Sequence, residues 1–359
     1  MFRDRFAEGD SVSSAGMAEV VGLDAERVTA WFAAHVPQAT PPLEFLLIAG
    51  GRSNLTFKVV DAAGDAWVLR RPPLGHVLAT AHDMAREHRV IAALAPTPVP
   101  VPPTMGLCTD DAVNGAPFYV MGYLDGHVLR DAKTAEARYS PDQRRRAGLG
   151  LADVLADLHA VDIDAVGLGD LGRTEGYVAR QLARWHGQFR ASTGETGRSV
   201  PMVDSVHARL AAAVPEQQRA TIVHGDCRLD NTVLDDEGGV LGVLDWEICT
   251  LGDPLADLGL LMVYWTEPGD AAPALGVSPT TAGGFPSRAE MKARYAERSG
   301  RDVDTLDFYV AFGYWKLACI LEGVYTRYAG GSGGGDRTGY DAYATQVGLL
   351  ATAADAALG

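Results

Sequence analysis

The first clear pattern of apolar positions along the chain has the spacing of a helix. Residues 24–36 place Val28, Trp31 and Phe32 on one face, and Asp24 precedes the run as an N-cap residue. Prolines between 37 and 42 then stop the helix. The pattern therefore predicts an amphipathic helix that buries one apolar face.

The apolar positions then take the period of strands. Three short runs rich in β-branched and aromatic residues follow the helix, and both gaps between them carry turn-forming residues. The runs are 45–49, 55–60 and 66–70, and the gaps are 50–54 and 61–65. We expect an antiparallel meander here, because no helix separates consecutive strands as a βαβ unit would require.

A helical period returns at 80–94, followed by a proline-rich extended connector at 95–104. Residues 117–126 predict one more strand, which ends in a glycine-flanked bend. We place a boundary between two lobes at this bend, near residue 124.

The remainder of the chain is predicted to be mainly helical. Ser140 and Pro141 are helix-start signals, and further helical spacing follows along the second half of the sequence. The predicted helices are 140–159, 176–191, 288–298 and 304–328. The expected fold class is α+β, with an antiparallel-sheet N-lobe over 43–124, a helical C-lobe over 125–359, and residues 1–42 as an N-terminal helical extension.

Composition narrows the function classes. The 359 residues carry a formal net charge of −15, which argues against a nucleic-acid or an anionic-membrane partner. The N-terminal residues are charged where a signal peptide needs an apolar run, and the apolar run 258–265 is too short to span a bilayer. We therefore expect a cytoplasmic protein.

Two other kinds of site, a dinucleotide site and a catalytic cysteine, are not favoured by the sequence. Residues 167–172 match GxGxxG by letter, but the weak preceding strand favours a loop over a dinucleotide site, and no P-loop motif occurs. Four cysteines form no CxxC pair; Cys227 lies beside the acid of interest, and a small core residue is a better interpretation than a catalytic thiol.

The segment 222–247 carries the candidate chemistry. Two strand-like runs, 231–234 and 240–244, flank the turn 235–239, so a hairpin would place Leu234 opposite Leu241 and Asn231 opposite about Leu244. Asn231 and Asp245 then share one end of the hairpin. Amide and carboxylate oxygens are ligands that suit Mg²⁺, which completes its shell with water and phosphate.

Asp226 precedes this hairpin at the exit of a short strand. A carboxylate near a metal and a phosphate can accept the proton of an attacking hydroxyl. Between Asp226 and Asp257 there are nine carboxylates and one arginine, which requires solvent or cations to neutralise them. A solvated acidic tip explains residues 235–237, but not the acids that adjoin apolar strands.

The motif HGD-x-x-x-x-N followed by D-W-E resembles the aminoglycoside phosphotransferase family, a small-molecule branch of the protein-kinase-like fold. The resemblance covers about 43–330 and implies ATP, or GTP in its place, and Mg²⁺. It implies that Asp226 is the catalytic base, that Asn231 and Asp245 bind the metal, and that His224 braces the loop. The segment 252–259 resembles the one that follows in this family, where an acid such as Asp257 holds the catalytic loop.

The resemblance also assigns the N-lobe to nucleotide binding. The turn 50–54 would cover the phosphates, with help from the side chains of Ser53 and Asn54. Arg70 stands where the family carries a phosphate-binding lysine, and Glu87 would pair with it; a surface arginine and an exposed helical glutamate are the competing readings. The hinge residues Met121 and Tyr123 would offer backbone groups to adenine.

Two departures from the kinase pattern bear on the substrate. Glu247 replaces the glycine of D-F-G, and only a short segment separates Asp245 from Asp253. Without a long activation loop, a protein substrate and phosphorylation-gated switching are disfavoured. The expected partner is a small-molecule hydroxyl acceptor.

The acceptor itself is left open. An acid-rich mouth would suit an aminoglycoside, whereas GGRSNLTF, VLRRPP, LADLHAVD and RQLARW resemble the branch that also occurs fused to acyl-CoA dehydrogenases, which implies a hydroxyacyl-type acceptor. The segment 180–186 could line the acceptor site, or it could be an amphipathic helix with Trp185 in the core. A non-catalytic nucleotide-binding pseudokinase is the main alternative function, a metal-dependent hydrolase lacks enough ligands, and the oligomeric state is open.

Overall fold

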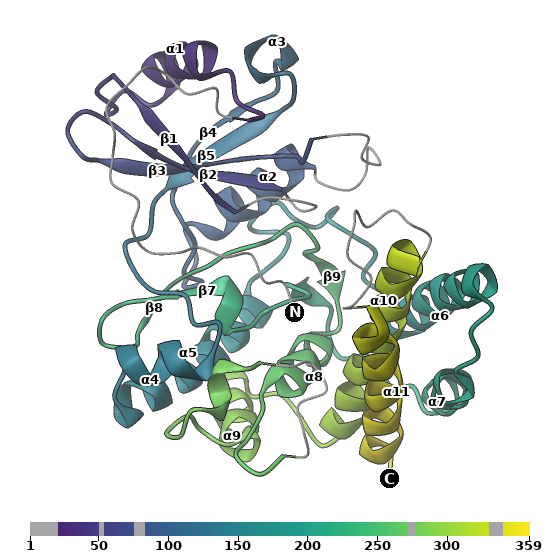
Figure 1. The fold of residues 1–359 in the computed structure, drawn as a ribbon. Helices are drawn as coiled ribbons and strands as arrows, with labels where there is room; N and C mark the ends of the chain where they lie inside the picture. The colour runs from purple at the N-terminus through teal and green to yellow at the C-terminus, as the bar shows by residue number, and fades with distance from the viewer. Residues whose placement is uncertain (1–20, 50–53, 75–82, 271–276, 330–339) are drawn as a thin grey trace. The chain divides into compact units, whose positions relative to one another are not determined.

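The computed structural model describes residues 21–49, 54–74, 83–270, 277–329 and 340–359 (Figure 1). The chain divides into two compact units. One unit comprises Met1–Asp125 with Leu244–Glu247, and the other comprises Gly126–Val243 with Ile248–Gly359. The short segment Leu244–Glu247 thus belongs to the N-terminal unit, although it lies far along the sequence.

The N-terminal unit is built on one five-stranded antiparallel sheet with the strand order β1-β2-β3-β5-β4. Its elements are α1 (Ala25–His35), β1 (Glu44–Ala49), β2 (Leu55–Val60), β3 (Ala66–Arg71), α2 (Met84–Leu94), β4 (Thr104–Cys108), α3 (Asp111–Asn114) and β5 (Phe118–Gly122). The first three strands form the predicted meander. The central strand β3 carries Arg70, and its last five residues are all buried.

Helix α1 closes the core of this unit against the sheet. Val28 and Phe32 are fully buried in one cluster with Phe57 of β2 and Phe118 of β5. Trp31 packs edge-on to Phe118 with the ring centroids 4.9 Å apart, and a Cβ at Gly106 would lie 2.9 Å from the Trp31 ring. The glycine in β4 is therefore what lets the indole approach the strand.

The C-terminal unit is mainly helical. Its helices are α4 (Ala132–Arg138), α5 (Pro141–Ala160), α6 (Tyr177–Thr196), α7 (Pro201–Ala212), α8 (Pro254–Tyr264), α9 (Arg288–Ser299), α10 (Leu306–Ala329) and α11 (Tyr340–Ala357). Figure 1 shows α10 and α11 running side by side, and α10 also packs on α8 and α6. Ser140 caps α5 with the reciprocal bonds of a capping box, as its start signals predict.

Two small antiparallel pairs complete this unit. Strands β6 (Thr221–Val223) and β9 (Thr250–Gly252) pair, as do β7 (Thr232–Leu234) and β8 (Val240–Val243). The β7–β8 register joins Thr232 to Val243, which is the predicted register, but a bulge then pairs Leu234 with Val240 instead of Leu241. Asn231 lies in a 3₁₀ turn, Leu229–Asn231, and not in the strand.

The predicted α+β fold class, with an antiparallel sheet before a helical part, is confirmed. Strands β4 and β9 are absent from the prediction. The proposed helix start at 80–82 and the turn residues 50–53 lie outside the described residues; the described helix begins at Met84, after its N-cap Asp83. Among the described residues, no helix combines the length and apolarity needed to cross a bilayer.

Candidate functional site

The loop after β6 is held by a buried carboxylate. Asp257, in the first turn of α8, accepts hydrogen bonds from the backbone N–H groups of His224 at 2.6 Å and Gly225 at 2.8 Å, and His159 Nε2 lies 3.4 Å from it. Burial pushes its pKa upward, but the hydrogen bond and charge of His159 outweigh burial, so the pKa of Asp257 lies below its ordinary value. The expected role of Asp257 in holding this loop is confirmed.

This clamp sets the position of Asp226. Gly225 has φ of +88°, a left-handed conformation that glycine adopts without strain, so the chain turns sharply before the acid. The Asp226 N–H donates to His224 Nδ1 at 3.2 Å, and His224 is fully buried. His224 therefore contacts the loop backbone from inside the unit.

The Asp226 carboxylate is half-buried and has three polar neighbours. Asn231 Nδ2 donates to Asp226 Oδ2 at 2.9 Å and to the Asp226 carbonyl at 2.8 Å. Arg228 Nε lies 3.4 Å from the same Oδ2, and the Tyr264 hydroxyl is a further hydrogen-bonding neighbour. These contacts fix the orientation of the carboxylate without enclosing it.

Arg228 and Tyr264 are site residues that the sequence does not single out. The Arg228 guanidinium also lies 3.2 Å from Asp230 and 4.8 Å from the centroid of the Tyr264 ring. Burial raises the pKa of the Tyr264 hydroxyl well above its usual range, and the Asp226 charge adds to this. The position of Arg228 two residues after Asp226 is the only sequence signal, because Tyr264 comes from the far end of α8.

A small cavity adjoins this loop in the same unit. Its volume is about 50 Å³, and Arg228, Asp230 and Tyr264 form part of its lining together with Ser278 and Thr280. Polar groups from the loop and from the segment after α8 therefore face one space.

Asp245 belongs to the N-terminal unit and has an unusual backbone. Its φ is +66°, and it is the one non-glycine residue with positive φ among those that the structure describes. Aspartate tolerates this left-handed conformation better than most side chains, but the conformation still stores strain. Such strain at a polar residue is typical of functional positions.

Asp245 contacts the predicted nucleotide residues of its own unit. Arg70 Nη2 lies 2.5 Å from Asp245 Oδ1, and Arg70 Nε lies 3.3 Å from Glu87 Oε2. Glu247 Oε2 lies 3.5 Å from the same guanidinium. One buried arginine thus faces three carboxylates. Arg70 is only 8% exposed and Glu87 only 1%, so the alternatives of a surface arginine and an exposed helical glutamate are wrong.

The pKa values in this cluster reflect its excess negative charge. Burial raises the pKa of Glu87 to about 7; Arg70 opposes the rise, whereas Asp245 and Glu247 add to it. Burial disfavours the charged Arg70, yet the surrounding carboxylates hold its pKa above the ordinary value. The cluster is therefore suited to take up a further cation.

Asn54 is the described part of the predicted phosphate turn. Its Nδ2 donates to Glu247 Oε2 at 3.0 Å, and its side chain is almost fully buried. Ser53 lies outside the described residues. Glu247, which the sequence shows only as a departure from D-F-G, therefore connects Asn54 with Arg70.

The predicted hinge residues lie at the end of β5. Met121 pairs with Val68 of β3 on one side and with Thr104 of β4 on the other. The Tyr123 N–H donates to the Ala66 carbonyl at 3.3 Å, and Lys58 Nζ lies 4.0 Å above the Tyr123 ring. Their role toward adenine stays a prediction.

The predicted acceptor segment 180–186 lies on α6, and Arg180, Arg184, Trp185 and His186 have different surroundings there. Arg180 donates to the Arg173 carbonyl at 2.7 Å, and His186 Nε2 lies 2.8 Å from Asp204. Trp185 is half-buried, not a core residue, and the Arg184 guanidinium lies 5.0 Å from its ring. Arg184 is thus the exposed cation of this helix segment.

Cys227 is a core residue, as the sequence analysis predicts. It is buried, and burial raises the pKa of its thiol well above the usual range. A thiolate nucleophile is therefore disfavoured at this position.

The residues present fit a Mg²⁺ site that relies on phosphate and water for most of its ligands. Asn231 directs its Nδ2 at Asp226, which leaves its amide oxygen as the group suited to a cation. Within the described part of the chain, no cluster of three or more His, Cys, Asp or Glu residues could hold a metal alone.

Comparisons of the sequence and of the structure with known proteins point to the same family. A model of the phosphotransferase enzyme family matches residues 44–293. A crystal structure assigned to the aminoglycoside phosphotransferases, from Ralstonia eutropha, is 34% identical with a TM-score of 0.79, covering 94% of this chain and 98% of that one. A choline kinase from Cryptosporidium parvum has a TM-score of 0.63 at 12% identity, covering 93% of this chain and 96% of that one, which shows the fold alone.

The curated relatives are longer proteins. Acyl-CoA dehydrogenase family member 10 of Mus musculus is 37% identical over 293 residues, which are 80% of this chain and 27% of the relative. Acyl-CoA dehydrogenase family member 11 of Rattus norvegicus is 35% identical over 288 residues, which are 79% of this chain and 36% of the relative. The chain thus spans about a third of the length of these relatives.

Proposed function

Since this chain belongs to the phosphotransferase enzyme family, we propose that it transfers the γ-phosphoryl group of ATP to a hydroxyl of a small molecule, with Mg²⁺ as cofactor. GTP is the other candidate donor. The acceptor is a hydroxyacyl-type molecule or, as the second candidate, an aminoglycoside-like one.

The observation that carries this proposal is the setting of Asp226. Its carboxylate is oriented by Asn231 at 2.9 Å and by Arg228 at 3.4 Å, and it is half-buried on a loop that Asp257 clamps. A general base needs this combination of fixed geometry and access to its substrate. Asp226 accepts the acceptor's hydroxyl proton while the hydroxyl oxygen bonds to the γ-phosphorus and the bond to the β-bridging oxygen breaks, releasing ADP.

The cluster around Arg70 binds the nucleotide. Arg70 binds phosphate oxygens through its guanidinium, Glu87 orients Arg70 from beneath, and Asn54 contributes amide donors next to the phosphate turn. Asn231 and Asp245 would hold Mg²⁺, which would supply charge neutralisation to the phosphoryl transfer when bound.

A hydroxyacyl-type acceptor is favoured by the relatives at 35–37% identity, whose names refer to acyl-CoA dehydrogenases. An aminoglycoside-like acceptor has the Ralstonia eutropha structure at 34% identity in its favour. The two classes differ in the sign of their charge, so a direct comparison of acceptors separates them.

The deciding experiment offers the wild-type chain Mg-ATP together with panels of hydroxy acids, their coenzyme A thioesters and aminoglycosides. ADP release is measured, and phosphorylated products are identified by mass spectrometry. We expect phosphorylation of at least one hydroxyl compound. Tight Mg-ATP binding without ADP release on any acceptor would instead identify a non-catalytic nucleotide-binding pseudokinase.

A further inference from the structure

Arg70 and Glu247 are two positions at which this chain departs from the kinase pattern, and the fold of the N-terminal unit brings them together. Glu247 Oε2 lies 3.5 Å from Arg70 Nη2. The Arg70 side chain is 10% exposed and that of Glu247 is 26% exposed, so water screens this pair only weakly. The two departures therefore form one interacting pair.

The guanidinium of Arg70 uses two of its nitrogens for different carboxylates. Its Nε lies 3.3 Å from Glu87 Oε2, and its Nη2 lies 2.5 Å from Asp245 Oδ1. A lysine ammonium is a compact point charge, whereas a guanidinium is a planar fork with donors on more than one side. An arginine at this position can therefore stay paired with Glu87 while Nη2 takes a second carboxylate.

Two carboxylates compete for Nη2. Charge-assisted N–H···O bonds are about 2.7–2.9 Å long, so Asp245 holds this bond in the structure, and Glu247 at 3.5 Å does not. Asp245 is also the proposed ligand of Mg²⁺. A cation on its carboxylate would repel Arg70 and take the oxygen that Nη2 now contacts. Nη2 then needs another acceptor.

Glu247 is held in the place of that acceptor. Asn54 Nδ2 donates to Glu247 Oε2 at 3.0 Å, and Arg86 Nη1 donates to the Glu247 carbonyl at 3.5 Å. A carboxylate oxygen accepts more than one hydrogen bond, so the bond from Asn54 leaves capacity for Nη2. A movement of less than about 1 Å would bring Nη2 into a charge-assisted bond with Oε2.

We propose that Glu247 is a positioning residue that takes over Arg70 Nη2 from Asp245 when Mg²⁺ binds. The exchange frees Asp245 for the metal and keeps the guanidinium in place for the phosphates. Glu247 thereby compensates for the arginine that stands in the position of a lysine. This inference rests on the proposed function, because it concerns the nucleotide cluster of the same site.

The test is a double-mutant cycle on the affinity for a non-hydrolysable ATP analogue, measured by calorimetry with Mg²⁺ and with EDTA. With Mg²⁺, we expect Glu247→Gln to weaken binding by roughly tenfold, as the loss of a contacting charged partner gives. The same substitution should change binding less than about twofold in EDTA, where Nη2 stays on Asp245, and in an Arg70→Lys background, which has no fork.

Two further variants support this test. Glu26→Gln, at an exposed position of α1 in the same unit, is the control and should leave binding unchanged. Glu247→Asp keeps the charge on a shorter side chain and should give the same pattern as Glu247→Gln. It replaces Glu247→Gln in the cycle if thermal melting shows that the glutamine variant does not fold.

Three outcomes overturn the inference. An equal loss in the Arg70→Lys background would make Glu247 act without Arg70, as a metal ligand would. An equal loss in EDTA would show that no exchange accompanies the metal. Unchanged binding in Glu247→Gln would remove its role altogether. A wild type that binds no nucleotide contradicts the proposed function itself, which is a different result from an additive cycle in a chain that binds.

Discussion

The two acidic clusters of this chain are built in opposite ways. In the helical unit, Asp257 and Asp226 are each matched by donors, and two backbone N–H groups just before Asp226 donate to Asp257. In the N-terminal unit, three carboxylates face the Arg70 guanidinium, and Asp245 has a strained backbone. The first cluster has the features of a rigid frame, and the second those of a site that gains stability when a cation binds.

The largest expected effect tests the rigid frame. Asp257→Asn replaces a carboxylate oxygen with an amide N–H that opposes the backbone N–H of Gly225 or His224. We expect the free energy of unfolding to fall by about 3 kcal/mol, since a buried charge pair loses one partner. Chemical denaturation measures this, with Asp304→Asn at an exposed position as the control; a loss equal to that of the control would contradict the frame.

The second effect tests the cation-accepting cluster. Asp245→Asn keeps a side chain that tolerates positive φ but removes one of the carboxylates around Arg70. We expect the Mg²⁺ concentration needed for half-maximal turnover to rise about 10- to 100-fold, a range typical when a metal site is perturbed. Thermal stability should stay the same or increase, unlike the outcome for Asp257→Asn.

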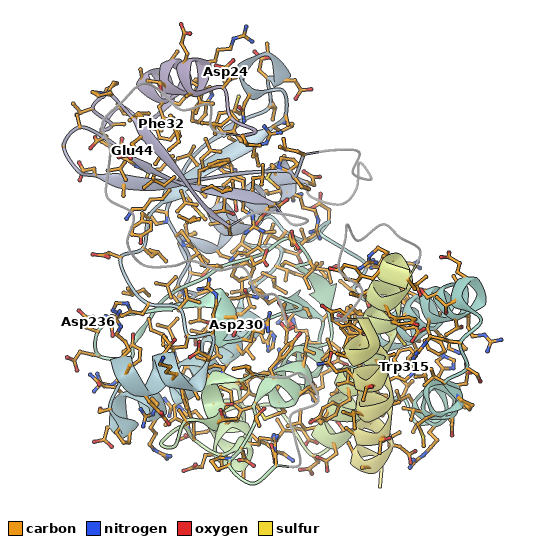
Figure 2. The ribbon with its side chains drawn as sticks, viewed as in Figure 1. Asp24, Phe32, Glu44, Asp230, Asp236 and Trp315 are labelled. Atoms are coloured by element: carbon orange, nitrogen blue, oxygen red, sulfur yellow. The ribbon has the colours of Figure 1, made fainter. Side chains whose placement is uncertain are left out.

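The matched control is Asp236→Asn in the hairpin turn, where the aspartate side chain is 90% exposed and labelled in Figure 2. It should leave both the Mg²⁺ dependence and the melting temperature unchanged. If Asp245→Asn destabilised the chain as strongly as Asp257→Asn, the two clusters would not differ in kind.

The smallest effect concerns pH. Burial raises the pKa of Glu87 to about 7, above its ordinary 4.5, so the folded state keeps a proton that the unfolded state has lost between these values. The contribution of Glu87 to stability is therefore complete below about pH 4.5 and is lost as pH rises toward 7.

Glu87→Gln cannot lose this proton, so its unfolding free energy should fall less than that of the wild type from pH 4.5 to 7. Denaturant titrations at several pH values measure the difference, with the exposed Glu136→Gln as the control. Parallel pH profiles for wild type and Glu87→Gln would show that Glu87 does not titrate in this range.

Periodicity predicts the elements that contribute long apolar faces. The helical spacing of Val28, Trp31 and Phe32 predicts α1. The turn residues between the apolar runs predict the meander β1-β2-β3. Strand β4 is missed because it follows prolines and contains Gly106, which is needed for the approach of Trp31. Strand β9 has only three residues, too few for any period.

The candidate site divides in the same way. Local spacing singles out Asp226, Asn231 and Asp245 as candidates, because they lie on one loop and one hairpin of the sequence. Spacing cannot identify Tyr264, because it reaches the loop from the far end of α8. Glu247 is visible in the sequence, but its contacts with Asn54 and Arg70 join residues that are more than 170 positions apart.

The most direct test of the account is a single-turnover measurement on Asp226→Asn with the acceptor found for the wild type. Asparagine has the shape of aspartate but cannot accept the hydroxyl proton, so we expect the transfer rate to fall by about 10²- to 10⁴-fold. Mg-ATP affinity, measured by calorimetry on the same variant, should be unchanged. A transfer rate equal to that of the wild type would contradict the assignment of Asp226 as the base.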